Sequence, residues 1–284
     1  MSVQNWILFI WLAHQIQMPV YERISAVVSL TLIGLALYFV LEFPDRATAI
    51  TLFDSPLALV SPRQWLMTLL LAGLVMAGTG NVVRSHPRLP DQRLTYLATF
   101  WMLPGLLVIL ATQTLGLAPN TVAWVIGLIG LGVLLWFTIL SQYHQVHPGL
   151  PPMHWSRLWQ QIVGFGLAFL MFIVIYYTRA RSALSATGVL LVGGMAALAL
   201  LRQRPQAITK TWLFAAIIGI CLGQITWALN YWRMGALQAG LLLLVIFYVL
   251  VGLAQQQMFG TLSRRALWEF GAVSLVGLIL IYYL

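Results

Sequence analysis

Long apolar runs separated by short polar segments dominate the sequence. Nine runs are long enough to form helices that cross the hydrocarbon core of a bilayer, which takes about 20 residues per helix. They fall at residues 24–41, 65–83, 95–113, 121–140, 158–178, 183–201, 211–229, 234–254 and 267–284. Each run is predicted to be helical, because a strand in lipid would leave backbone amides without partners. The pattern therefore predicts an all-α fold, a polytopic transmembrane helical bundle of about nine spans.

The N-terminal segment does not fit this pattern. Its apolar stretch, Trp6 to Ala13, is too short to span a bilayer. No basic residue precedes the stretch, as would be typical of a signal peptide. We predict a short interfacial helix within residues 1–22 and a single transmembrane domain over residues 23–284.

Two polar segments between spans resemble each other. HPRLP begins at His86 and HPGLP begins at His147, and an Arg-Leu pair that opens the next span follows each of them. The similarity suggests a parallel hairpin repeat near residues 65–150, related by an axis along the membrane normal. Chance similarity between apolar chains is the alternative interpretation.

Composition confines the protein to the membrane. Hydrophobic residues make up 61% of the 284 residues and charged residues only 7%, whereas a soluble domain carries about 25% charged residues. The mean hydropathy is +0.91. The net charge of +9 is therefore expected to mark loops beside anionic membrane lipids, and no nucleic-acid partner is predicted. Cys221 is the only cysteine, so no intrachain disulfide can form.

The basic residues predict an orientation. Ten of the fifteen fall on one side of the predicted spans: Arg23, Arg84, Arg88, Arg93, Arg157, Arg202, Arg204, Lys210, Arg264 and Arg265. Since positive residues concentrate on the cytoplasmic side, this side is predicted to be cytoplasmic. We expect a plasma-membrane protein of the bacterial inner-membrane type, with its N-terminus inside and its C-terminus outside.

A histidine-rich segment, HQVHPGLPPMH, is the candidate metal site. It contains His144, His147 and His154, which could supply three ligands. However, the prolines between His147 and His154 impose an extended, turning backbone, and no acidic residue lies nearby to complete the site. We favour a polar loop at the headgroup level and expect no metal and no other cofactor.

The first predicted outer loop, residues 42–63, is the candidate functional surface. It contains Glu42, Asp45 and Asp54, three of the six acidic residues. Asp45 would match the catalytic acid that transferases using lipid-linked sugars place in their first outer loop, and it is a weak catalytic candidate. The alternative is an interfacial segment in which Asp45 and Arg46 are solvated. We further expect the loop to fold back as a cap over the outer ends of the spans. No acidic residue lies in the middle of a predicted span, as proton- or sodium-coupled carriers usually require.

Polar and small residues inside the spans predict close helix packing. Gly219 and Gly223 share one helix face, an arrangement that lets a neighbouring helix approach. Seven polar residues lie inside or near the ends of spans: Asn81, Gln113, Gln160, Gln161, Gln224, Thr226 and Gln238. We favour interhelical hydrogen bonding for them over a polar lining for a substrate.

Three functions remain open from the sequence. The leading hypothesis is a non-catalytic scaffold or a subunit of a larger complex, with membrane-protein partners. The second is a carrier or flippase for a neutral or lipidic substrate, and the third is the lipid-linked transferase that would use Asp45. The balance leans away from an enzyme.

The basic asymmetry yields a topology prediction. A reporter fused after Arg204 should be active only in the cytoplasm, and one fused after Leu284 only outside, as paired phosphatase and fluorescent-protein fusions would measure. A cytoplasmic reporter after Leu284 would contradict the count of nine spans.

Overall fold

The computed structural model describes most of the chain. The described residues are 3–40, 51–52, 55–56, 62–86, 89, 93–146, 154–178, 182–202, 208–232, 234–260 and 264–283. The helices are α1 (Val3–Val40), α2 (Pro62–Arg84), α3 (Leu94–Thr114), α4 (Thr121–His144), α5 (His154–Tyr177), α6 (Ser182–Leu200), α7 (Ile208–Leu229), α8 (Ala236–Phe259) and α9 (Arg264–Tyr283), with a 3₁₀ turn η1 (Leu115–Leu117). This arrangement confirms the predicted helical bundle.

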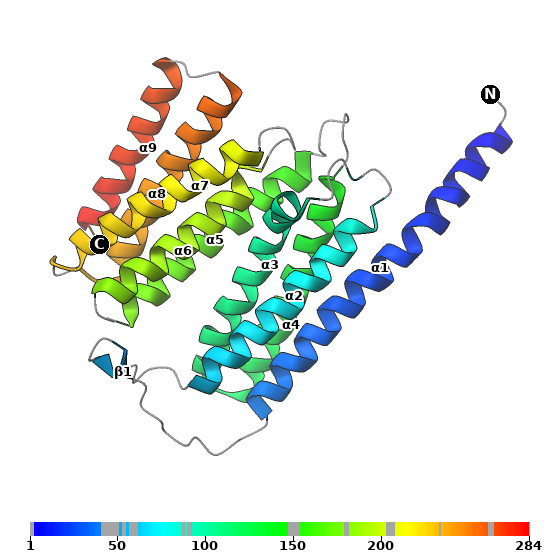
Figure 1. The fold of residues 1–284 in the computed structure, drawn as a ribbon, viewed down its shortest axis with the longest axis horizontal. Helices are drawn as coiled ribbons and strands as arrows, with labels where there is room; N and C mark the ends of the chain where they lie inside the picture. Colours follow the sequence, from blue (N-terminus) through cyan, green and yellow to red (C-terminus); the bar gives the residue numbers. More distant parts are fainter. Residues whose placement is uncertain are drawn as a thin grey trace.

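Successive helices run in opposite directions through the bundle (Figure 1). Within the described residues, eight of them are long and apolar enough to cross a membrane, and α9 contains a shorter apolar stretch, Trp268–Ile279. The bundle therefore has two ends. Helices α4, α6 and α8 terminate at one of these ends, and α3, α5 and α7 begin there. We call it the Arg202 end, after Arg202, which follows α6.

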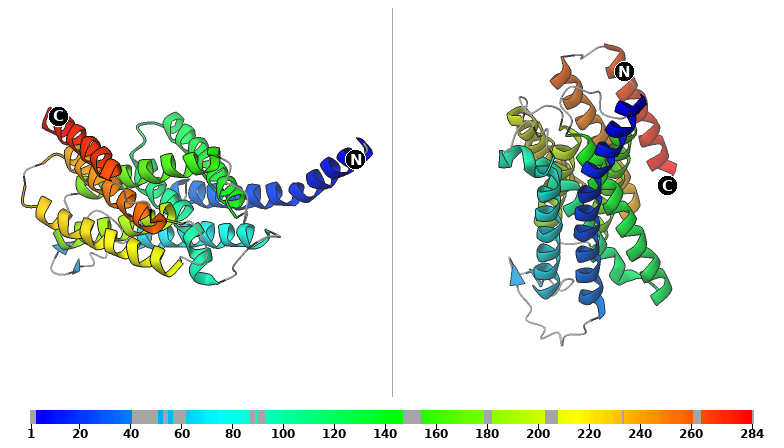
Figure 2. Two further views of the ribbon diagram at one scale, coloured as in Figure 1. Left: turned by 90° about the horizontal axis from the view of Figure 1, so that it is seen from above. Right: turned by 90° about the vertical axis from the view of Figure 1, so that its right-hand side faces the viewer.

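Helix α1 differs from the expectation for the N-terminus. The predicted short interfacial helix does not end near residue 22, because one continuous helix runs over 38 residues from Val3 to Val40. Hydropathy indicates how deep a residue lies in a membrane, but polar residues with good helix propensity continue a helix. Figure 2 shows the N-terminal part of α1 extending past the other helices. Only Val20–Phe39 qualifies as a span.

Helices α3 and α6 form the centre of the bundle. In α3, 67% of the most apolar window is buried and in α6 56%, against 28% in α1, α4 and α8. Phe100, Phe172 and Phe247 are the largest of the fully buried side chains. Phe172 and Phe247 pack edge to face, with ring centroids 6.0 Å apart. Because α6 lies at the centre, Arg202, which follows it, is surrounded by residues of the neighbouring helices.

Two short strands lie in the segment between α1 and α2. Strand β1 (Thr51–Leu52) pairs antiparallel with β2 (Ser55–Pro56), with Leu52 opposite Ser55. The acidic residues predicted to form a cap, Glu42, Asp45 and Asp54, lie outside the described residues. The outer cap and the catalytic role of Asp45 therefore stay predictions.

Helices α6 and α7 approach each other closely at glycine. A Cβ atom added at Gly219 would lie 2.7 Å from the carbonyl oxygen of Leu190 and 3.3 Å from the Cα atom of Gly194. One added at Gly223 would lie 3.2 Å from the carbonyl oxygen of Ala186. Because these neighbours are backbone atoms, they cannot move aside as a side chain can. Both glycines thus face α6 across a backbone-to-backbone contact.

We predict that Gly219→Ala destabilises the protein. The added methyl group forces α6 and α7 apart, at a cost of about 1–3 kcal/mol, and Gly223→Leu should cost more. Thermal unfolding in detergent would measure the loss. The matched control is Gly73→Ala on α2, where an added Cβ atom meets nothing within 4 Å. Equal unfolding temperatures for Gly219→Ala and wild type would contradict the prediction.

Candidate functional site

Two of the three histidines predicted as weak metal candidates, His144 and His154, lie at the Arg202 end. His144 is the last residue of α4, and its Nδ1 atom lies 2.9 Å from the carbonyl oxygen of Leu140, in the preceding turn. His154 begins α5, and His147 lies outside the described residues. Within the described residues, no group of three metal-binding side chains comes together. A site that includes His147 stays untested.

The most unusual chemistry lies instead around Arg202. Its Nη2 atom donates to the side-chain oxygens of Gln145 at 2.6 Å and Gln160 at 3.3 Å. Its Nη1 atom donates to the carbonyl oxygen of Thr99 at 3.3 Å. The guanidinium carbon lies 3.7 Å from the centroid of the Phe100 ring, within cation–π distance. We call these five residues the Arg202 cluster.

The fold brings the cluster together from four helices. Thr99 lies near the start of α3 and Gln160 near the start of α5, whereas Gln145 directly follows α4 and Arg202 follows α6. The antiparallel order of these helices places all four positions at one end. Leu200 and Leu201 are buried beside Arg202, so the end of α6 is anchored in the core and draws the arginine inward.

A second layer of hydrogen bonds surrounds the cluster. Ser141 Oγ donates to the carbonyl oxygen of Ser156 at 2.9 Å, and Gln145 Nε2 donates to the same oxygen at 2.9 Å. Gln160 Nε2 donates to the carbonyl oxygen of Ala199 at 2.6 Å, and Gln255 Nε2 donates to that of Leu200 at 3.2 Å. The amides of Gln160 and Gln255 thereby satisfy the carbonyls of Ala199 and Leu200, which have no partner within the end of α6.

The cluster holds a cation without a carboxylate. Within the described residues, no acidic side chain pairs with Arg202, and all its hydrogen-bond acceptors are neutral. Although the residue is only half-buried, protein surrounds the guanidinium closely enough for burial to lower the pKa of Arg202 to about 10. Arg202 therefore remains charged at neutral pH. The negative ends of the dipoles of α4 and α6, which both terminate here, stabilise the charge.

Further polar atoms at this end are buried without a partner among the described residues. Gln142, in the last turn of α4, is 1% exposed, and within the described part of the chain neither atom of its amide has a hydrogen bond. Thr138 Oγ1, one turn earlier, and Gln256 Oε1 on α8 also lack partners among the residues that the structure describes. An unsatisfied buried polar group costs about 1–3 kcal/mol, so the Arg202 end contains unused hydrogen-bonding capacity.

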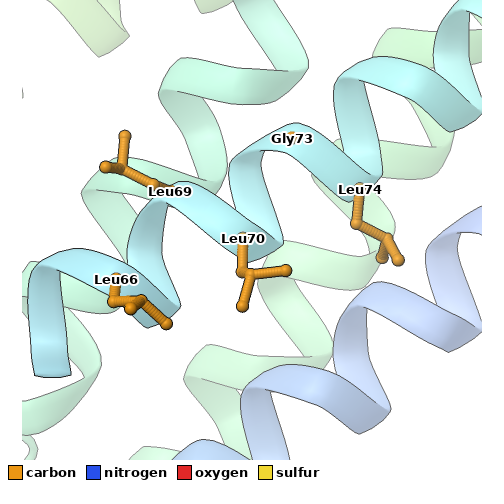
Figure 3. Close-up of a pocket in the computed structure, with 5 residues that line it drawn as sticks. All are labelled: Leu66, Leu69, Leu70, Gly73 and Leu74. Carbon is orange, nitrogen blue, oxygen red and sulfur yellow. The ribbon is translucent and has the colours of Figure 1, made fainter.

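The outer surface of α2 carries an apolar hollow. Leu66, Leu69, Leu70, Gly73 and Leu74 line it (Figure 3), and it is open, with a volume of about 530 Å³. It offers no polar group, so it can do no chemistry beyond contact with an acyl chain or another apolar surface. It is not part of the Arg202 cluster.

Most of this site is not predicted by the sequence. The charge pattern places Arg202 among ten basic residues in loops, and the position of Gln160 near a span end predicts helix packing. No pattern in the sequence singles out Gln142, Gln145 or Ser156. One signal is present: Arg202 directly follows the apolar run AALALL with no polar spacer, and such an arginine must lie at or below the membrane surface.

The comparisons with known proteins give a family but no activity. Residues 43–284 match the model of a family described as "Protein of unknown function (DUF5656)". The chain belongs to this family. The matched region begins after α1 and includes every residue of the Arg202 cluster. No curated protein matches the chain, and no solved structure matches it.

We predict that Gln160→Leu destabilises the bundle by about 1–2 kcal/mol, because it removes two interhelical hydrogen bonds from a buried position. Thermal unfolding in detergent, with and without the substitution, measures the effect. The control is Gln161→Leu, because the neighbouring residue makes no hydrogen bond among the described residues and is more exposed. If both variants unfolded at the same temperature as wild type, the hydrogen bonds of Gln160 would not stabilise the fold.

Proposed function

We propose that this protein is a non-catalytic membrane component, a scaffold or a subunit of a larger assembly. The observation that carries the proposal is the use made of its buried polar side chains. Gln145, Gln160 and Gln255 bond to other helices instead of facing a cavity. Side chains that fasten helices in this way favour a rigid bundle over one that opens and closes. We further propose a plasma-membrane location with the Arg202 end facing the cytoplasm.

Helix α1 supports the scaffold hypothesis. Its buried positions, Ile24, Val28, Thr31 and Leu35, repeat at the spacing of a helix that packs along one seam. They face the rest of the bundle, where α2 and α4 are its main neighbours. The opposite face carries Leu30, Ile33 and Leu37, each about half exposed at 55%, 57% and 49%. In a membrane such a face contacts lipid, and it is open to the helix of another membrane protein.

A carrier for a neutral or lipidic substrate is the second candidate. Gln142 favours it, because its buried amide has both a donor and an acceptor free of partners within the described residues. A substrate that moved between helices could use both. For a carrier, transport in proteoliposomes should fall when Gln142 is replaced by leucine. For a scaffold, no transport should occur.

A photocrosslinking experiment in native membranes tests the scaffold proposal. The photoreactive residue benzoylphenylalanine would replace Ile33 on α1, Ile126 on α4 or Leu278 on α9, all exposed apolar positions. A scaffold should yield a discrete protein adduct at near-stoichiometric amount from at least one of these three faces. The probe at the fully buried Leu35 is the control, and it should react only within the chain. Adducts with lipid alone from all three faces would contradict the proposal.

A further inference from the structure

Arg202 has more hydrogen-bond donors than the protein uses. A guanidinium carries five N–H groups, and the described residues accept three hydrogen bonds from it. Two N–H groups, including that of Nε, are left without a partner among the described residues. The residue is half-buried, and its Nε atom is not among the polar atoms of the described residues that are both fully buried and unpartnered, so the edge that carries Nε remains open. A charged group with unused donors and an open edge has the properties of an anion-binding site.

The surroundings place this site at the level of lipid headgroups. Trp155 at the start of α5 and Trp212 at the start of α7 are 64% and 39% exposed, and exposed tryptophans mark the interface between lipid and water. Trp212 Nε1 donates to the carbonyl oxygen of Thr95 at 3.1 Å, which connects the interface to the helix that supplies Thr99. The Arg202 cluster therefore lies close to the depth at which lipid phosphates are concentrated.

The charge of this end matches an anion. Five basic residues with exposed side chains lie on the same side of the bundle as Arg202: Arg23, Arg84, Arg93, Arg157 and Lys210. Of the acidic residues in the described part of the chain, only Glu22 and Glu269 are present, and both are exposed. Such a surface attracts anionic groups, and Arg202 is the member of the set that is held in a fixed position.

We infer that the Arg202 cluster is a binding site for a phosphate group, in which the unused Nε–H group of Arg202 donates to a phosphate oxygen. Gln145, Gln160 and Thr99 fix the guanidinium from the inner side, so that the donors are oriented before the anion arrives. The phosphate can belong to an anionic lipid or be free in solution, and both sources use the same donors. The inference does not depend on whether the bundle is a scaffold or a carrier.

Arg202→Lys separates phosphate binding from helix fastening. A lysine ammonium has three N–H groups, as many as the described residues accept from Arg202. The variant keeps the positive charge and can keep the inner contacts, but it has no donor left for a ligand. Affinity for the phosphate ligand should therefore fall by roughly tenfold or more, since charge-assisted hydrogen bonds are lost. The control is Arg157→Gln, which removes a whole charge at the exposed rim and should change affinity by less than about threefold.

The experiment uses delipidated full-length protein in a mild detergent, titrated with phosphatidylglycerol, phosphatidylcholine or inorganic phosphate. Native mass spectrometry counts the bound lipids, and thermal unfolding reports stabilisation by each ligand. Tight binding of one phosphatidylglycerol that Arg202→Lys weakens and Arg157→Gln does not would support a lipid phosphate. Equal stabilisation by inorganic phosphate, also lost in Arg202→Lys, would support a free phosphate. No preference for phosphatidylglycerol over phosphatidylcholine together with no effect of phosphate would overturn the inference, as would unchanged binding in folded Arg202→Lys.

A second measurement covers the case in which Arg202→Lys does not fold. Phenylglyoxal modifies accessible arginines, and peptide mapping identifies the modified residue in the wild-type protein. Phosphatidylglycerol or phosphate should slow modification of Arg202 at least several-fold, while phosphatidylcholine should not. The exposed Arg157 serves as the internal reference for general effects of the additives. Equal rates at Arg202 with every additive would overturn the inference.

Discussion

A buried cation in a chain with so few carboxylates has to be stabilised by neutral groups. Moving a charge out of water is expensive, and the cost is offset only when dipoles or counter-charges surround it. At Arg202 the dipoles come from two glutamine side chains, a backbone carbonyl, the Phe100 ring and the ends of α4 and α6. Since these groups belong to four helices, the requirement to solvate one guanidinium fixes how α3, α4, α5 and α6 meet.

The opposite end of the bundle lacks such a constraint among the described residues. There, Tyr176 Oη donates to the carbonyl oxygen of Leu229 at 3.0 Å, and Asn230 Nδ2 donates to Ser185 Oγ at 2.8 Å. Each of these bonds joins two helices and involves no charge, so each stabilises the fold by about 1 kcal/mol. Among the described residues, the two ends are therefore held in different ways: neutral interhelical hydrogen bonds at one, and a connected network around a charge at the other. Cooperative networks of this kind are worth more than the sum of their bonds.

The architecture could be predicted from the sequence, because hydrophobic length is a strong signal in a membrane. The helices follow from the requirement that backbone groups in lipid pair within their own segment, and eight of the predicted spans correspond to described helices that qualify as spans. The continuity of α1 could not be predicted in the same way. The end of the apolar stretch near Ala13 indicates how deep that residue lies in a membrane. It does not indicate where the helix ends.

The site was harder to predict, because it depends on which ends of distant helices meet. Thr99 and Arg202 are 103 residues apart, and Gln145 and Arg202 are 57 apart. No local pattern connects them. The glutamines are uninformative singly, since a glutamine near a span end can equally face water, lipid headgroups or a neighbour. The position of Arg202 directly after an apolar run is the one signal that limits where its side chain can lie. That signal indicates burial only when it is combined with the position of α6 at the centre of the bundle.

The unused donors at Arg202 and the unpartnered amide of Gln142 bear on one question, whether this end is complete within the chain. Gln142 lies in the last turn of α4, three residues before Gln145, which directly follows that helix. A protein that fastens its helices with Gln145 and Gln160 has no structural need for a further buried glutamine with both amide atoms idle. Leucine at position 142 would fill a similar volume without the cost of the unsatisfied groups. Glutamine at position 142 therefore leaves a buried donor and acceptor that are unpartnered among the described residues, close to the Arg202 cluster.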